Sequence, residues 1–151
     1  MFNFKDKVAV ITGGARGIGK CIREQFEAAG AVVCVIDLLE NDYFVGDLAD
    51  KDTLERFAKK VIADYGHVDY LINNALPKMR GIDSCSYEDF EHALRVGVAA
   101  PFYLSKLFAP HFAVQRPFPI YLNVLLPSTV TDALKIVIQS YIMQSLSPVF
   151  N

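Results

Sequence analysis

Apolar and polar positions divide the first part of the chain into two alternating kinds of segment. Short apolar runs without polar alternation occur at residues 8–12 and 31–37, and such runs are typical of parallel strands that helices cover on both faces. Longer segments lie between or after these runs and repeat their apolar residues at helical spacing. In residues 51–65, for example, Leu54 and Phe57 share one face while the lysines face outward.

This alternation predicts an α/β fold. In chain order we expect strands at residues 8–12, 31–37, 43–45 and 68–73, and helices at residues 17–29, at residues 51–65 and from Ser86 onward. Ser86 with Asp89 three residues later is typical of a capping box that begins a helix, and Pro101 is expected to interrupt that helix. Alternating strands and helices imply a doubly wound parallel sheet with right-handed crossovers.

The composition changes abruptly near residue 112. The first 111 of the 151 residues hold 29 of the 32 charged residues and all nine glycines, whereas six of the seven prolines lie at or after Pro101. We therefore separate residues 1–112, which hold the alternating strands and helices, from a divergent tail at residues 113–151. Within the tail we expect a fifth strand at residues 120–126, and apolar residues at helical spacing predict a helix at residues 131–146.

A glycine-rich segment joins the first predicted strand to the first predicted helix. Gly13 is expected to permit a sharp turn, Gly17 to let the backbone approach a pyrophosphate, and Gly19 to let the helix pack close to the sheet. A phosphate would then lie at the helix N-terminus, where unpaired N–H groups attract anions. Because the loop follows a buried strand and opens a helix, it indicates a Rossmann-type cofactor site rather than a merely tight turn.

A carboxylate at the end of the second predicted strand bears on the choice of cofactor. Asp37 lies 18 residues after Gly19, where a carboxylate can accept hydrogen bonds from the hydroxyls of the adenosine ribose. The same charge would repel the 2′-phosphate of NADP, whereas Arg16 beside the loop could attract it. We expect the repulsion to outweigh the exposed attraction, so the predicted cofactor is NAD, with NADP less favoured.

Charge and cysteine content argue against several other classes of function. The net charge of −2 and the lack of a Lys/Arg run argue against nucleic acid as a partner. Three widely spaced cysteines show no zinc or redox spacing, so we assign no metal site and expect a reducing, cytoplasmic setting. The charged N-terminus and the lack of a run of roughly 18 apolar residues predict neither a signal peptide nor a membrane anchor.

Four motifs together resemble the short-chain dehydrogenase/reductase family. They are Thr12-Gly-Gly-Ala-Arg-Gly-Ile-Gly19, Gly46-Asp47-Leu48, Asn73-Asn74-Ala75, and the stretch from Leu94 to Leu107. The resemblance implies an NAD(P)-dependent oxidoreductase that transfers hydride between the nicotinamide and an alcohol or ketone, and it includes a homo-oligomer among the expected assemblies. Taken with the glycine loop, it implies cofactor contacts from Gly13, Arg16, Gly17, Ile18, Gly19, Asp37, Asp47, Leu48, Asn74 and Ala75.

The chain departs from the family pattern at three places. Leu76 stands where the family's Asn-Asn-Ala motif continues with glycine, and Arg95-Val-Gly97 occupies the position of the usual catalytic asparagine. None of the seven tyrosines is followed four residues later by lysine, so the Tyr-x-x-x-Lys of the family is missing. Ser128 lies roughly where the family's serine would stand, but a plain turn hydroxyl is favoured there. We assign no catalytic residue.

These departures leave three hypotheses open. The first is an oxidoreductase of the short-chain type acting on a small-molecule substrate of unknown identity. The second is a non-catalytic dinucleotide-binding module or a fragment that retains binding. The third is a chain that does not fold stably, because the sheet is expected to be incomplete at its C-terminal side. The loss of charge after residue 112 also suggests a chain truncated or shifted in reading frame relative to a longer ancestor.

Overall fold

A computed structural model describes residues 3–78, 80–112 and 120–123 of the chain. They form one parallel five-stranded sheet with the order β3-β2-β1-β4-β5. The strands are β1 (Val8–Thr12), β2 (Val32–Asp37), β3 (Phe44–Val45), β4 (Tyr70–Asn73) and β5 (Ile120–Asn123). The helices are α1 (Gly17–Ala28), α2 (Lys51–Tyr65), α3 (Tyr87–Leu94) and α4 (Ala100–Phe108), with a π-helical turn η1 (Arg95–Ala99) and a 3₁₀ turn η2 (Ala109–His111). The predicted doubly wound sheet is confirmed.

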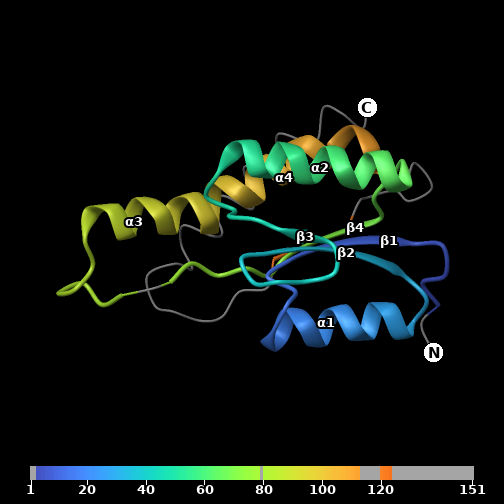
Figure 1. Cartoon of the computed structure of the whole chain (residues 1–151), viewed down its shortest axis with the longest axis horizontal. Coiled ribbons are helices and arrows are strands. Elements are labelled where there is room, and N and C mark those ends of the chain that lie inside the picture. The colour runs from blue at the N-terminus through green and yellow to red at the C-terminus, as the bar shows by residue number, and fades with distance from the viewer. Residues whose placement is uncertain (1–2, 79, 113–119, 124–151) are drawn as a thin grey trace.

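Helices cover both faces of the sheet, as the unbroken apolar runs of the strands predict. Figure 1 shows α1 on one face, α2 and α4 on the other, and α3 reaching beyond the end of the sheet. Every residue of β1 is buried, and its side chains alternate between two cores: Val10 packs on the α2 and α4 side, whereas Ile11 packs on the α1 side. Phe57 and Phe108 are fully buried in the larger core. Within the described part of the chain, no helix is long and apolar enough to cross a membrane.

The ends of α2 lie at the predicted residues because an aspartate side chain caps its start and a glycine ends it. The Asp50 side chain accepts hydrogen bonds from the N–H groups of Asp52 and Thr53 and so caps the N-terminus. Gly66 ends the helix in the left-handed conformation with φ 76°, which glycine adopts without steric cost.

The prediction that Pro101 interrupts the third helix is wrong. The chain stays helical from α3 through η1 into α4, and the Ala100 N–H donates to the Arg95 carbonyl five residues earlier. Pro101 lies in the first turn of α4, where a missing N–H is tolerated. The π-helical turn shifts the backbone hydrogen bonding by one residue before the proline, so the helix changes its hydrogen-bond register instead of ending. The predicted capping box of Ser86 and Asp89 at the start of α3 is confirmed.

One strand of the tail belongs to the same sheet as the first part of the chain. β5 pairs in parallel with β4, from Tyr70 opposite Ile120 to Asn73 opposite Asn123. This strand lies inside the range expected for it, residues 120–126. The predicted helix at residues 131–146 and Ser128 fall outside the described residues.

Candidate functional site

The carboxyl ends of β1, β2 and β4 meet at one edge of the sheet. In the order β3-β2-β1-β4-β5, the chain runs outward in opposite directions from the boundary between β1 and β4. Loops that leave neighbouring strands on opposite sides open a crevice at such a boundary, and ligands of open α/β sheets bind there. The glycine-rich loop follows β1, Asp37 ends β2, and Asn74 with Ala75 follows β4. Three of the predicted site segments therefore lie at this edge.

Gly13 makes the turn that leaves β1, as expected. Its φ is +70°, and a Cβ atom on it would lie 2.9 Å from the Cα of Ala75. Its N–H donates to the Ile36 carbonyl at 2.8 Å, which continues the bonding between β1 and β2 by one residue. A side chain at this position would meet both backbone strain and a neighbouring backbone atom.

Gly17 and Gly19 have different surroundings. Gly17 has φ +58°, and none of the described residues has an atom within 4 Å of a Cβ built on it. A Cβ on Gly19 would overlap the Gly13 carbonyl oxygen and the side-chain nitrogen of Asn74. Gly19 therefore permits close packing, as predicted, but its close neighbours are the loop itself and the residue after β4. Gly17 leaves open space beside the N-terminus of α1.

The N-terminus of α1 lacks the capping groups that the other loop-initiated helices possess. Its N-cap residue, Arg16, makes no side-chain capping bond, and the first turn contains no acidic residue. By contrast, Asp50 caps α2 and Ser86 caps α3, and both helices carry acidic residues in their first turns. The free N–H groups and the positive end of the helix dipole make the start of α1 suitable for an anion such as a phosphate.

Asp37 faces the glycine loop from the end of β2. Its Oδ2 atom accepts the N–H of Ala15 at 2.9 Å, and its Oδ1 atom accepts the N–H of Leu39 at 3.0 Å. The residue is half-buried. An ionised carboxylate offers about four acceptor positions, so two remain for further donors.

Thr12 is a site residue that sequence reasoning did not assign a role. Its hydroxyl oxygen accepts the N–H groups of Asn74 at 3.1 Å and Ala75 at 3.0 Å. The Asn74 side-chain amide donates back to the carbonyls of Thr12 at 3.1 Å and Gly13 at 2.9 Å. These bonds join the end of β4 to the start of the glycine loop. The sequence signal that could have indicated this role is that Thr12 is the single polar residue at the end of an otherwise apolar strand.

The remaining predicted contacts lie around β3 and the start of α2. Asp47 accepts the N–H of Ala49 at 2.8 Å, and its other carboxylate oxygen lies 3.8 Å from the Nε2 atom of His92 on α3. Leu48 is buried in the larger core. These contacts place Asp47 near the carboxyl edge and tie it to α3.

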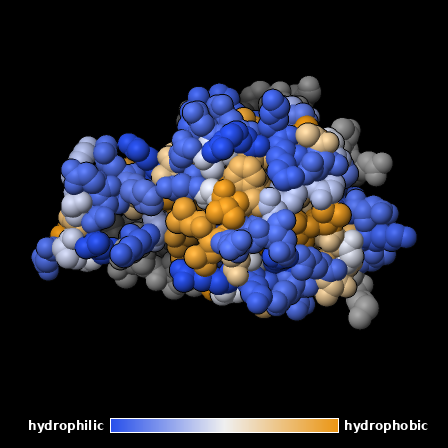
Figure 2. All heavy atoms as spheres, in the orientation of Figure 1, coloured by the Kyte–Doolittle hydropathy of each residue, from blue (hydrophilic) through white to orange (hydrophobic). Residues whose placement is uncertain are grey.

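Exposed apolar side chains surround Asp37 and the loop. Figure 2 shows apolar side chains gathered over the carboxyl ends of β2 and β3. Leu38 and Val45 there are 66% and 54% exposed, and Ile18 at the start of α1 is 46% exposed. An apolar surface of this kind suits a flat aromatic ring such as adenine. Sequence reasoning included Ile18 among the contacts but not Leu38 or Val45.

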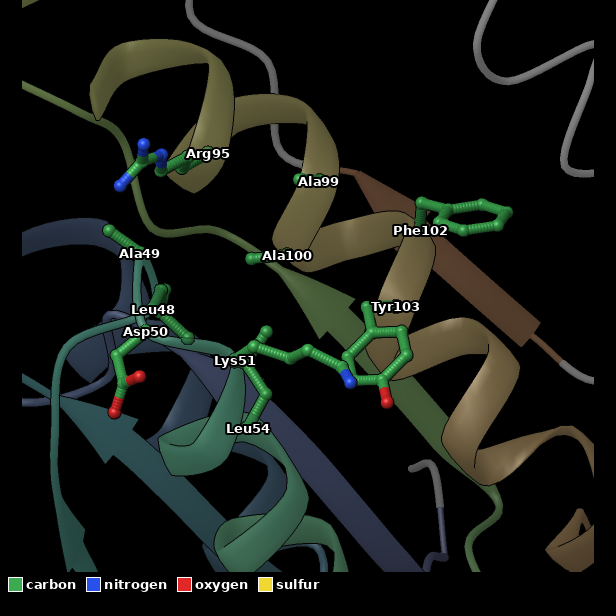
Figure 3. A pocket seen from close by; sticks show the side chains of 10 residues that line it. All are labelled: Leu48, Ala49, Asp50, Lys51, Leu54, Arg95, Ala99, Ala100, Phe102 and Tyr103. Carbon is green, nitrogen blue, oxygen red and sulfur yellow. The ribbon is translucent and has the colours of Figure 1, made fainter. Parts of the chain in front are cut away.

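A second hollow of about 530 Å³ lies between the start of α2 and α4. Figure 3 shows Lys51 extending toward Tyr103. Lys51 Nζ lies 3.2 Å from a carboxylate oxygen of Glu55, and the Tyr103 hydroxyl donates to that same oxygen. This hydrogen bond raises the pKa of Tyr103 above its ordinary value. A tyrosine that acts as an acid–base group near neutral pH needs the opposite shift.

Comparison with known proteins gives consistent results. A family model described as "short chain dehydrogenase" matches residues 7–117. An uncharacterised oxidoreductase of Thermotoga maritima is 36% identical over 121 residues, covering 69% of this chain and 47% of that protein. Momilactone A synthase of Oryza sativa subsp. japonica is 32% identical over 144 residues, covering 84% of this chain and 53% of that protein.

A solved structure of a metagenomic short-chain oxidoreductase in complex with NADP is also similar. It matches with a TM-score of 0.72 and 26% identity, over 80% of this chain and 61% of that one. The chain thus spans about half the length of the curated relatives it matches.

Proposed function

The chain belongs to the short-chain dehydrogenase family, and from this premise we propose that its described part binds the dinucleotide cofactor of an NAD(P)-dependent oxidoreductase. The observation that carries the proposal is the bare N-terminus of α1. Arg16 makes no capping bond there, Gly17 leaves open space, and the Asp37 carboxylate stands on the other side of the loop. Free N–H groups for a pyrophosphate and an acceptor for a ribose are thus brought together.

The cofactor contacts divide by the chemistry of each part of the dinucleotide. The loop residues Gly13 to Gly19, with Arg16 and Ile18, would surround the pyrophosphate. Asp37 would accept the hydroxyls of the adenosine ribose, and Asp47 with Leu48 would lie on the adenine side. Ala75, held to Thr12, would face the cofactor after β4, while Asn74 supports the loop from below.

We propose NAD as the preferred form of the cofactor. Asp37 is half-buried and presents a negative charge where NADP carries its 2′-phosphate. Arg16 is exposed, so solvent screens its attraction for that phosphate more strongly. The solved relative is bound to NADP, so membership of the family does not by itself favour NAD. A comparison of the measured affinities for the two forms therefore has to decide between NAD and NADP.

When bound, the nicotinamide would supply the hydride or accept it, and the substrate would be a small alcohol or ketone. The described residues contribute the binding and orientation of the cofactor.

A second candidate function is dinucleotide binding without turnover. It is favoured by Gly97, which lies in the stretch where the family usually has a catalytic asparagine. The two functions differ in one assay: the oxidoreductase oxidises at least one alcohol in a broad panel with NAD, whereas the binding module oxidises none.

Titration of the purified chain with NADH and NADPH, followed by nicotinamide fluorescence, tests cofactor binding. We expect NADH to bind more tightly than NADPH, and Asp37→Ala to weaken NADH binding about tenfold through loss of charged hydrogen bonds. Asp42→Ala is the matched control, because Asp42 lies on the same β2–β3 connection and pairs with Arg23 instead of the loop. A wild-type chain that binds neither cofactor would refute the proposal.

A further inference from the structure

We propose that Asp37 is also a positioning residue for the glycine-rich loop, which it holds in its binding conformation before any cofactor arrives. The effect on cofactor affinity rests on the proposed function, whereas the effect on the loop does not. A carboxylate that only accepts ribose hydroxyls would affect the adenosine end of the ligand alone. A carboxylate that also shapes the loop affects the phosphate end as well.

The first line of evidence is the way the β1–β2 pairing continues past its last strand residues. Thr12 pairs with Ile36 at the end of the ladder, and the next backbone bond joins the Gly13 N–H to the Ile36 carbonyl at 2.8 Å. Beyond that point the loop turns away from β2. The Asp37 side chain then reaches the Ala15 N–H at 2.9 Å. A side-chain acceptor thus extends the ladder to a residue that the backbone of β2 does not reach.

The second line of evidence is that the Asp37 carboxylate is itself held in place. Its Oδ1 atom accepts the Leu39 N–H at 3.0 Å, so the chain after β2 fixes the orientation of the group. The Asp37 carbonyl accepts the Gly46 N–H at 2.9 Å, so β3 restrains its backbone. The Oδ2 atom is therefore aimed at the loop by contacts that exist without a ligand.

Gly14 before this bond is buried against Val35, whereas the loop has little steric restraint after it. Gly17, two residues after Ala15, has φ +58° and no neighbour within 4 Å of an added Cβ. Arg16 between them is exposed and makes no capping bond. Removal of the Asp37 carboxylate would therefore free Ala15 and the start of α1 to leave the conformation that directs their N–H groups toward a phosphate.

The two roles of Asp37 are compatible. The two N–H bonds use one acceptor position on each oxygen, and about two further positions remain for ribose hydroxyls. The same side chain can therefore shape the loop and accept the ribose.

The test compares wild type, Asp37→Ala, Asp37→Asn and the control Asp42→Ala in two measurements. The first is hydrogen exchange of the Ala15 amide in the chain without cofactor. The second is the affinity for reduced nicotinamide mononucleotide, which carries a phosphate but no adenosine ribose.

We expect Asp37→Ala to speed exchange at Ala15 about tenfold and to weaken mononucleotide binding several-fold, with the control unchanged. Asn offers one acceptor oxygen to two N–H donors, so Asp37→Asn should give intermediate values and keeps the test valid if the alanine variant unfolds.

The outcomes separate this inference from the proposed function. If Asp37→Ala and Asp37→Asn weaken NADH but leave both Ala15 exchange and mononucleotide affinity unchanged, Asp37 contacts only the ribose and the inference is overturned. If the wild type binds no nicotinamide ligand, the proposed function fails. The exchange measurement then still decides whether Asp37 holds the loop.

Discussion

The side-chain amide of Asn74 donates a hydrogen bond to the backbone carbonyl of Gly13 at 2.9 Å. This contact connects the residue after β4 to the turn after β1, across 61 residues of sequence. It makes the fourth strand a support for the glycine-rich loop.

Replacing Asn74 by alanine should therefore destabilise the fold and weaken cofactor binding together. Two carbonyls, those of Thr12 and Gly13, lose their amide donor, and an unpaired polar group in a half-buried site costs about 1–3 kcal/mol. Urea denaturation measures the loss of stability, and NADH titration measures the loss of affinity. Asn41→Ala serves as a comparison, because in the described part of the chain the side chain of Asn41 bonds to nearby backbone groups within residues 39–44. Equal NADH affinities for Asn74→Ala and wild type would contradict this assignment.

Alanine at Gly17 and alanine at Gly19 should have different effects. At Gly17 the added Cβ meets nothing, so the cost is the left-handed backbone, about 1–2 kcal/mol, and the variant should fold but bind NADH poorly. At Gly19 the added Cβ overlaps the Gly13 carbonyl, so the loop itself must move. Thermal unfolding followed by circular dichroism should show the larger loss for Gly19→Ala. A larger loss of thermal stability for Gly17→Ala than for Gly19→Ala would contradict the loop contacts described above.

The N-cap of α2 should make stability depend on acidic pH. A hydrogen bond from the Thr53 side chain holds the pKa of Asp50 below its ordinary value of 3.8. Because the folded state has the lower pKa, this stabilising contribution is present above pH 3.8 and is lost as the pH falls through the folded-state pKa. Asp50→Asn keeps a capping oxygen but does not titrate. Its melting temperature should therefore fall less than that of wild type below pH 4. An equal decrease in melting temperature for the two proteins would contradict this role of Asp50.

Cys21 and Cys34 should differ strongly in reactivity. Burial raises the pKa of the Cys34 thiol to about 11, and its side chain is fully buried on β2, whereas Cys21 on α1 is exposed. A disulfide-exchange reagent at pH 8 should modify Cys21 quickly and Cys34 only when the protein unfolds. Mass spectrometry of wild type and Cys21→Ser checks the assignment. Rapid labelling of Cys34 in the folded chain would show that the β2 region opens readily.

The sequence was sufficient for features that depend on neighbouring residues. The extent of α2 was predicted from its apolar spacing, and the structure shows that Asp50 and Gly66 fix its ends. The turn at Gly13 follows from glycine spacing after an apolar strand. The π-helical turn was missed because a proline signals a lost hydrogen bond, but not whether the helix ends or changes register.

Other features arise only when distant segments meet. The Thr12 hydroxyl has two donors 62 and 63 residues away, and no local pattern indicates them. The bond from Ala15 to Asp37 likewise depends on how the loop crosses the end of β2. Motifs thus located the candidate site, whereas the bonds that hold it together required coordinates.

The uncapped start of α1 also makes the stability of the folded chain depend on the concentration of its ligand. Where α2 and α3 carry their own capping side chains, the first turn of α1 leaves this task to water or to an incoming anion. A ligand that binds only the folded state stabilises it by about 2.7 kcal/mol at a hundred times its Kd. The dinucleotide would then act as a detachable cap, and the cell's cofactor concentration would set how often this end of the sheet opens.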